Sequence, residues 1–225
     1  MKATNYVSQF PHLQKEIALL RQGYRFIAGL DEAGRGAWAG PVVAAAVILP
    51  VDSSDVAKEL NGVRDSKKLS PRQREQLFET IHLVALAVAV GQAPANIVDD
   101  LNVVGATRCA MQQAISNLNQ SPDYLLIDHL KLSSIGLPQQ AFAKADNISL
   151  TVAAASVVAK VTRDRMMVNH HQTYPAYAFD RHKGYGTQIH RAALAKYGPC
   201  PLHRMSYEPL KILPLQRSGQ QAAHE

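Results

Sequence analysis

The most constraining feature of this sequence is a set of three short apolar segments that each lead to acidic side chains. Residues 26–30 lead to Asp31 and Glu32, residues 124–127 lead to Asp128, and residues 140–144 lead to Asp146. Short apolar runs of this kind are typical of buried strands, and side chains at strand ends of an α/β sheet project into a shared crevice. We therefore expect these four carboxylates to lie together at one edge of a sheet.

Gathered carboxylates need a partner, because an unpaired charge is costly to bury. Hard oxygen ligands favour Mg²⁺ or Mn²⁺. The alternative is that each acid caps a helix or pairs with a lysine, which is the usual case for a single acid at a strand end. Three such strands, one with adjacent acids, favour the metal site. The remaining acids of note are assigned to structure: a local ion pair within residues 160–165 for Asp164, and turn or cap positions for Asp52, Asp55, Asp99 and Asp100.

Strand-like and helix-like segments interleave along the chain, which predicts a layered α/β fold. The expected strands are residues 26–30, 42–49, 83–90, 124–127 and 140–144. The expected helices are residues 13–21, 72–81, 95–118, 149–171 and 188–196, the third broken near Gly105. Helix 72–81 has Ser70 as its cap and Pro71 at its first position. Residues 33–41 and 175–187 are expected to be loops.

A glycine-rich loop follows the first pair of acids. Gly34, Arg35 and Gly36 open a segment that formally matches a dinucleotide-binding pattern, G-x-G-x-x-A. Two acids directly before the glycines would repel a pyrophosphate, and the β-branched run that follows does not begin a helix. The better interpretation is a loop whose backbone approaches a ligand closely and whose arginine contacts a phosphate or sugar, including a ribose 2′-hydroxyl.

Charge and composition favour a polyanionic partner. The chain of 225 residues carries a net charge of +6 and is 47% hydrophobic, which indicates a packed, basic protein. Lys67 and Lys68 lie in a polar loop that suits phosphate contact, although a merely solvated loop is an equal alternative. Tyr185 stands between two glycines, where its ring is open to stacking on a sugar or base. Lys160, Arg163 and Arg165 form either a basic stripe or a solvated helix face.

Cysteine usage and hydropathy indicate a cytoplasmic protein. Cys109 and Cys200 are too few and too far apart for a disulfide framework or a metal cluster. The first 21 residues lack the apolar core of a signal peptide, and the longest apolar runs are much shorter than the roughly 20 residues of a membrane span.

Taken in order, these segments resemble the type 2 ribonuclease H family, which includes bacterial ribonuclease HII. The stretches that carry the resemblance are Gly29 to Gly36 with Ala39 to Val43, Asp65 to Leu69, Leu126 to Asp128, Lys144 to Asp146, Ala153 to Ser156 with Ala159 to Asp164, His182 to Thr187, and Gly198-Pro199 with His203-Arg204. They run from about residue 25 to residue 210 and so cover nearly the whole chain.

The resemblance implies a ribonuclease H-like fold, a mixed five-stranded sheet flanked by helices with a C-terminal helical region. It divides the chain into a lead-in (1–24), a catalytic domain (25–210) and a polar tail (211–225). It implies cleavage of the RNA strand of RNA–DNA hybrids and cleavage at single ribonucleotides embedded in duplex DNA. The family's catalytic metal ligands fall on Asp31, Glu32, Asp128 and Asp146; its junction-reading element falls on Gly34, Arg35 and Gly36, and its stacking tyrosine on Tyr185.

The sequence departs from the family pattern at three places. Ala37-Trp38 stands where Pro-Leu is frequent, His129 stands where glycine often follows the third acid, and Ala145 stands where glycine usually precedes the fourth. All four acids are present, so we expect activity, with small backbone differences near Asp128 and Asp146.

The expected chemistry is two-metal-ion phosphodiester hydrolysis with Mg²⁺ or Mn²⁺, giving 5′-phosphate and 3′-hydroxyl ends. The expected partners are RNA–DNA hybrids and ribonucleotide-containing duplex DNA, acted on by a monomer without membrane contact; the sequence names no protein partner. Two alternatives stay open: a DNA resolvase or integrase-type metal nuclease on the same fold, and a non-catalytic nucleic-acid binding protein.

Overall fold

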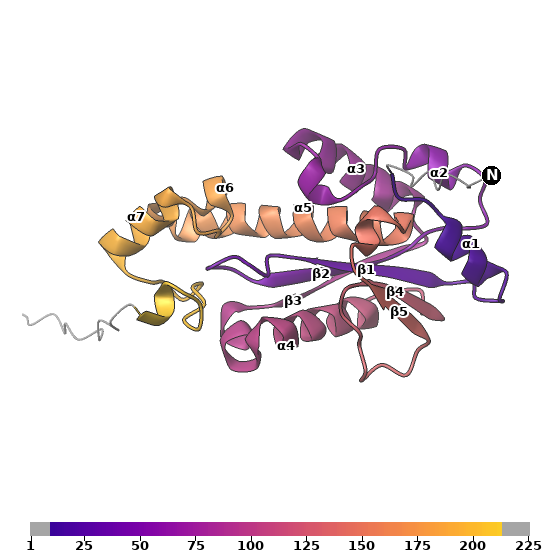
Figure 1. The fold of residues 1–225 in the computed structure, drawn as a ribbon. Helices are drawn as coiled ribbons and strands as arrows, with labels where there is room; N and C mark the ends of the chain where they lie inside the picture. Colours follow the sequence, from indigo (N-terminus) through magenta and orange to yellow (C-terminus); the bar gives the residue numbers. More distant parts are fainter. Residues whose placement is uncertain (1–9, 213–225) are drawn as a thin grey trace, which may run out of the picture.

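A computed structural model describes residues 10–212, and in this part of the chain one mixed sheet lies between two layers of helices (Figure 1). Its strand order is β3-β2-β1-β4-β5. The strands are β1 (Ile27–Ala33), β2 (Val42–Ile48), β3 (Ala87–Ala93), β4 (Tyr124–Asp128) and β5 (Gln139–Phe142). β1, β2 and β3 pair antiparallel, whereas β4 pairs parallel with both β1 and β5. The predicted mixed five-stranded sheet is therefore confirmed.

β2 lies inside the sheet, and helices cover both of its faces. All seven of its residues are buried, which confirms the strand expected from this β-branched and alanine-rich run. On one face its side chains join a core with α5 (Leu150–Thr173) and α3 (Pro71–Val84), and on the other a core with α4 (Ala95–Ser116). Figure 1 shows α5 and α3 on one side of the sheet and α4 on the other.

Helix α5 approaches β1 closely at Gly29. A Cβ atom on Gly29 would lie 2.4 Å from the backbone carbon of Thr151, so only glycine fits at this crossing. The side chain of Ser149 accepts a hydrogen bond from the amide of Val152 and caps the helix, which confirms the long helix expected here. The close approach brings the first turns of α5 against the strand that carries Asp31.

Helix α3 is longer than expected, and this displaces the next strand. Its capping box at Ser70 and Gln73, with Pro71 at the first position, confirms the predicted start. The helix continues to Val84, however, and β3 begins only at Ala87, so the strand expected at 83–90 is wrong at its start. The apolar run predicted the wrong strand boundary because Leu83 is 86% exposed and belongs to the end of the helix rather than to the sheet.

Helix α4 is interrupted at Asn102 rather than near Gly105 as expected. Asn102 has φ 57° and ψ 173°, and its side-chain oxygen accepts hydrogen bonds from the amides of Val104 and Gly105. The asparagine thus ends one helical segment and caps the next. Gly105 itself continues the helix.

The remaining helices are short. They are α1 (Gln14–Leu20), α2 (Val56–Glu59), α6 (Phe179–His182) and α7 (Gln188–Tyr197), with 3-10 turns η1 (Ser66–Lys68), η2 (Ala145–Asn147), η3 (Pro175–Tyr177) and η4 (Leu210–Ile212). The segment expected to be a loop at 175–187 contains η3 and α6. Figure 1 places α6 beside the C-terminal end of α5 and α7 further out on the same side.

Helix α1 packs on the start of α5 through a buried glutamate. Glu16 is fully buried and accepts hydrogen bonds from the Ser149 hydroxyl at 2.5 Å and the Thr151 amide at 3.1 Å. The described part of the expected lead-in therefore packs on the start of α5. Most of the expected polar tail, residues 213–225, lies outside the described residues, as do residues 1–9. Among the described helices, none has the length and apolar character needed to cross a bilayer.

Candidate active site

Two of the four predicted acids lie on neighbouring parallel strands. The register of β1 and β4 ends at the pair Leu30 and Ile127, so Asp31 and Asp128 follow it directly on adjacent strands. Both acids belong to their strands, because β1 runs on through Glu32 to Ala33 and β4 ends at Asp128. Adjacent parallel strands at this register direct the two aspartates to the same side of the sheet.

The fourth acid is positioned by a turn rather than by a strand. β5 ends at Phe142, and Asp146 lies in η2, so the expectation that the fifth strand leads directly to it is wrong. The amide of Ala145 donates a hydrogen bond of 2.7 Å to Oδ1 of Asp128, and this bond fastens the turn to the end of β4. A long-range hydrogen bond, rather than the direction of a strand, therefore positions Asp146.

The backbone differs from ordinary geometry beside the third acid. His129 has φ 60°, a conformation that costs a non-glycine residue roughly 1–2 kcal/mol. This is the position where the family often has glycine. Ala145 does not have a positive φ. In that turn the residue with a positive φ is Lys144, at 57°.

Three of the acidic side chains, Asp31, Glu32 and Asp146, lie in an electrostatic environment that disfavours their ionisation. Burial is the main cause that raises the pKa of Asp31 well above its ordinary value, and the charges of Glu32 and Asp128 raise it further. Burial likewise raises the pKa of Glu32, although Arg35 opposes the shift. The pKa of Asp146 is raised first by burial and then by Asp65 and Asp128. Mutual repulsion among these acids indicates that they face a common space.

That space is a cleft of about 600 Å³ lined by three of the four predicted acids and by the glycine loop. Its walls include Asp31, Glu32, Gly34, Arg35, Gly36, Ser66, Lys67, Asp128, Ser156, Lys160 and Tyr185. Asp146 is not among the lining residues, and its link to the site is its electrostatic interaction with Asp128. Three of the four acids, the loop and the tyrosine are thus brought together by the fold.

The glycine loop is anchored from the C-terminal region. The guanidinium of Arg204 donates to the carbonyl oxygens of Arg35 at 2.9 Å and of Gly40 at 2.8 Å, and the Tyr207 hydroxyl donates to the Arg35 carbonyl at 2.6 Å. The Arg35 side chain forms an ion pair of 3.2 Å with Glu32. A Cβ on Gly36 would meet nothing within 4 Å, so this part of the loop is open to a ligand. Strand β2, and no helix, follows the loop, which agrees with rejection of the dinucleotide-binding alternative.

The two predicted lysines differ in position. Lys67 lines the cleft and its charge lowers the pKa of Glu32 and of Asp146. Lys68 does not line the cleft, and its ammonium donates a hydrogen bond of 2.5 Å to the side chain of Asn147. Both side chains are exposed.

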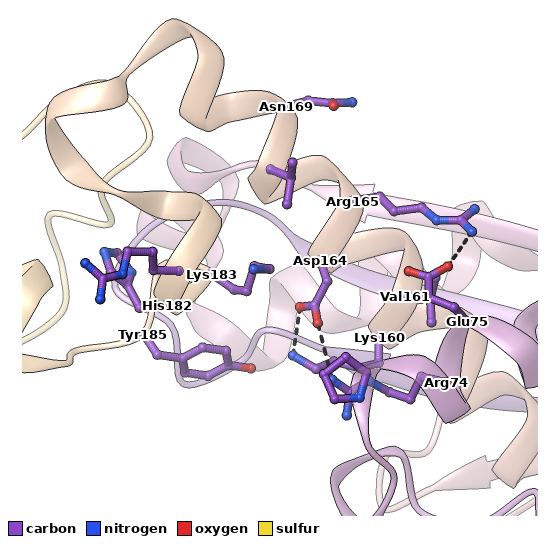
Figure 2. A pocket seen from close by; sticks show the side chains of 13 residues that line it. Arg74, Glu75, Lys160, Val161, Asp164, Arg165, Asn169, His182, Lys183 and Tyr185 are labelled. Carbon is purple, nitrogen blue, oxygen red and sulfur yellow. Dashed lines mark hydrogen bonds and ion pairs between the residues drawn. The ribbon is translucent and has the colours of Figure 1, made fainter.

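Tyr185 borders both the cleft and a second groove, also of about 600 Å³, between α3, α5 and α6. Figure 2 shows Tyr185, Lys183 and Lys160 along this groove, with Arg165 further along α5. The ring is half-buried rather than freely approachable on both faces, because the guanidinium of Arg163 lies 5.3 Å and the ammonium of Lys160 lies 5.6 Å from its centre. The two hollows share Lys160 and Tyr185.

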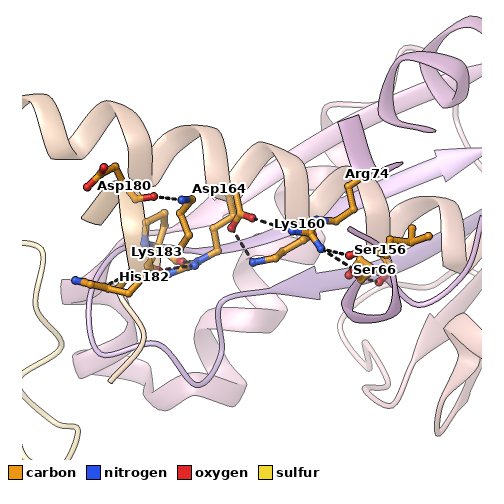
Figure 3. Close-up of polar contacts among 12 residues, drawn as sticks. Ser66, Arg74, Ser156, Lys160, Asp164, Asp180, His182 and Lys183 are labelled. Carbon is orange, nitrogen blue, oxygen red and sulfur yellow. Dashed lines mark hydrogen bonds and ion pairs between the residues drawn. The ribbon is translucent and has the colours of Figure 1, made fainter. Parts of the chain in front are cut away.

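The three basic residues of α5 do not form one stripe. Arg163 is fully buried and donates to the carbonyl oxygens of Pro41, Lys183 and Ala39, so neither the stripe nor the solvated face describes it. Lys160 and Arg74 pair with Asp164 at 2.7 and 3.8 Å, which confirms the expected local ion pair (Figure 3). Arg165 is exposed and pairs with two glutamates of α3.

Sequence reasoning did not single out Ser156, which lies against the first acid. Its hydroxyl hydrogen bonds with Asp31, which lowers the pKa of that aspartate, and lies 3.2 Å from the hydroxyl of Ser66 (Figure 3). Both serines are buried. The available signal was a single hydroxyl directly after the alanine run 153–155.

Comparison with known proteins identifies the family of this chain. The family model described as ribonuclease HII matches residues 28–209. A ribonuclease HII from Geotalea uraniireducens is 50% identical over 199 residues, which cover 88% of this chain and 90% of that protein. The chain belongs to the ribonuclease HII family. It is therefore an endoribonuclease, a hydrolase.

Solved structures related to the ribonuclease HII family share the fold. Ribonuclease H2 from Pyrococcus horikoshii superimposes with a TM-score of 0.67 at 26% identity, over 83% of this chain and 95% of that one. A structure of Bst-RNase HIII in complex with Mn²⁺ has a TM-score of 0.61 at 20% identity, over 83% of this chain and 68% of that one. The second likeness shows a shared fold alone.

Proposed function

We propose that this ribonuclease HII cleaves the RNA strand of RNA–DNA hybrids and cuts at ribonucleotides embedded in duplex DNA, leaving 5′-phosphate and 3′-hydroxyl ends. The observation that carries the proposal is the shared cleft, in which a mutually repelling set of acids lies beside an anchored glycine loop and a tyrosine. Acids suit a cation that binds a phosphate, whereas the loop and the ring suit a sugar and a base.

The proposed cofactors are two divalent ions, Mg²⁺ or Mn²⁺, held by Asp31, Glu32, Asp128 and Asp146. The donor set fits such ions: all are carboxylates, and Oε2 of Glu32 is buried without a hydrogen-bond partner. Among residues 10–212, no three acidic, histidine or cysteine side chains are grouped closely enough to count as a metal site by geometry alone. Arg35, now paired with Glu32, is the group that a cation would replace. When bound, the ions supply the Lewis-acid chemistry for hydrolysis.

The chain's own groups bind and orient the substrate. Arg35 and the amides of the glycine loop lie close to the acids, so a phosphate drawn to the acids places its neighbouring ribose against the loop. Tyr185 sits where the cleft meets the second groove and can stack on the following deoxyribose. Lys67 adds positive charge at the rim, and Ser156 orients Asp31. The combination favours a junction with RNA on one side and DNA on the other over a continuous RNA strand, which supplies the 2′-hydroxyl but no deoxyribose.

We further propose that the enzyme acts as a cytoplasmic monomer on these nucleic acids. The basic side chains along the second groove, among them Arg74, Arg165, Arg181 and Lys183, support a nucleic-acid partner because they extend the positive charge away from the acidic cleft.

The decisive experiment compares three duplexes of one sequence: all DNA, DNA with one ribonucleotide, and a continuous RNA–DNA hybrid. Cleavage of the last two with Mg²⁺ or Mn²⁺, and none of the first, is the expected result. The variant Asp31→Asn should be inactive while remaining folded, because a ligand oxygen is lost from the site. Cleavage of the all-DNA duplex would favour a resolvase-type nuclease, and activity in excess chelator would contradict the metal site.

A further inference from the structure

Three buried histidines lie directly behind Tyr185. They come from three segments: His182 ends α6, His190 lies in the first turn of α7, and His203 lies in the segment after α7. All three side chains are less than 9% exposed. The rings of His182 and His190 are stacked with their centres 4.4 Å apart.

Two of these rings form a hydrogen-bonded path with a single consistent direction. Nδ1 of His190 lies 3.1 Å from the carbonyl oxygen of Tyr185, and a carbonyl only accepts, so this nitrogen carries the proton. Nε2 of a neutral His190 then accepts from Nε2–H of His203, 3.0 Å away. Because its Nε2 carries the proton, Nδ1 of His203 is unprotonated; it accepts from the amide of Cys200 at 2.9 Å, and the Cys200 carbonyl oxygen, 3.1 Å away, receives no proton from it. The Tyr185 carbonyl and the contact between the two rings thus fix opposite tautomers for the two histidines.

The third histidine holds the other side of the same peptide segment. The amide of Gly184 donates to Nδ1 of His182 at 3.1 Å, which leaves Nε2–H of His182 to donate to the carbonyl of Tyr177 at 2.8 Å. The backbone is therefore held by histidine rings at Gly184 and at Tyr185. A Cβ on Gly184 would lie 2.3 Å from the carbonyl oxygen of Ala39, so the segment is also pressed against the residues that follow the glycine loop.

The same cluster connects the tyrosine to the glycine loop. The amide of Trp38 donates to the carbonyl of Gly184 at 2.9 Å, and Ala39 forms an isolated antiparallel bridge with His203. Burial is the first cause that lowers the pKa of both His190 and His203 to about 4, so both rings are neutral near pH 7, as the path requires. The path is therefore present under ordinary conditions.

We propose that His190 and His203 are positioning residues, which set the place of the Tyr185 ring relative to the glycine loop through this directed pair of hydrogen bonds. The proposal rests on the junction-stacking role of Tyr185 under the proposed function. Neither histidine lines the cleft, so they act through the tyrosine's backbone and do not contact the substrate.

The first test measures the tautomers directly. ¹⁵N NMR of the histidine side chains in the whole protein near pH 7 should show His190 protonated at Nδ1 and His203 protonated at Nε2. The same tautomer at both positions, or a charged ring at either, would overturn the proposal without any measurement of activity.

The second test is a double-mutant cycle on the duplex with one ribonucleotide. Tyr185→Ala should lower kcat/KM by roughly 5- to 150-fold, the usual range for loss of a stacked ring. His190→Leu should cause a similar loss, but little further loss when added to Tyr185→Ala, because the tyrosine is the group it positions. His190→Asn, whose amide can replace the Nδ1–H donor, should retain more activity than His190→Leu. His82→Leu, at an exposed histidine outside the cleft, is the matched control.

The outcomes separate this proposal from the proposed function. Multiplicative losses in the double variant, or no rescue by asparagine in a folded His190→Asn protein, would assign His190 a purely structural role. If Tyr185→Ala cleaves normally, the stacking role and the positioning role both fail, while discrimination among the three duplexes still tests the proposed reaction.

Discussion

Replacement of Arg163 by methionine should destabilise the protein by about 3 kcal/mol. The guanidinium is fully buried and donates to the carbonyl oxygens of Pro41 at 2.8 Å, Lys183 at 2.9 Å and Ala39 at 3.0 Å. Methionine would leave these oxygens without the donor, at a cost of about 1–3 kcal/mol for each buried group. These hydrogen bonds join the loop after the acids to the segment before Tyr185. Their loss should therefore also reduce activity.

The cost of leaving these carbonyl oxygens unpaired is partly offset, because the substitution also removes a buried charge. Burial lowers the pKa of Arg163 to about 10, and a shift of this size corresponds to about 3 kcal/mol against the charged form. The remaining loss of about 3 kcal/mol should lower the melting temperature by about 6–12 °C in a chain of this length. Arg163→Lys should be no more stable than Arg163→Met, because lysine keeps the buried charge but cannot reach three carbonyls with a planar fork.

Urea unfolding, followed by circular dichroism with and without Mg²⁺, measures the difference. Arg165→Met is the matched control, since Arg165 lies on the same helix, is exposed, and makes surface ion pairs worth at most about 1 kcal/mol. A loss below about 1 kcal/mol for Arg163→Met, or a lysine variant close to wild type, would refute the carbonyl clamp.

The remaining predictions concern charge at the site and beneath it. Lys67→Ala should weaken binding of hybrid and DNA duplexes alike and reduce the salt dependence, whereas Lys68→Ala should do so less, because only Lys67 lines the cleft; equal salt slopes for the two variants would contradict this. Asp31→Asn should raise the urea midpoint of the metal-free protein, since the pKa of Asp31 is raised by burial and by repulsion; an unchanged or lower midpoint would show that the charge is not strained. His190 and His203 have folded pKa values of about 4, below the ordinary 6.5, so the unfolded chain binds more protons between these values. Their contribution to stability should be complete above about pH 6.5 and be lost as the pH falls towards 4, and His190→Asn should flatten that part of the stability curve in pH-dependent unfolding.

Much of this protein was determined by local sequence. The β-branched run of β2, the capping box of α3 at Ser70 and Gln73, and the uninterrupted α5 have their signals within a few residues, so their structures agree with the predictions. The convergence of Asp31 and Asp128 also followed from local pattern, because two apolar strands that end in acids need only pair in parallel to bring these side chains together.

The tertiary structure decided the rest, because the partners concerned are distant in sequence. The position of Asp146 depends on a bond from Ala145 to Asp128, and the burial of Arg163 depends on carbonyls more than a hundred residues earlier in the chain as well as on one twenty residues later. Hydrophobic periodicity cannot reveal such contacts, because from sequence alone an arginine on a helix is expected to be exposed. Only the fold shows that three carbonyl oxygens surround it. The histidines behind Tyr185 show the same limit: their tautomers and their function depend on which groups the fold brings to each ring nitrogen.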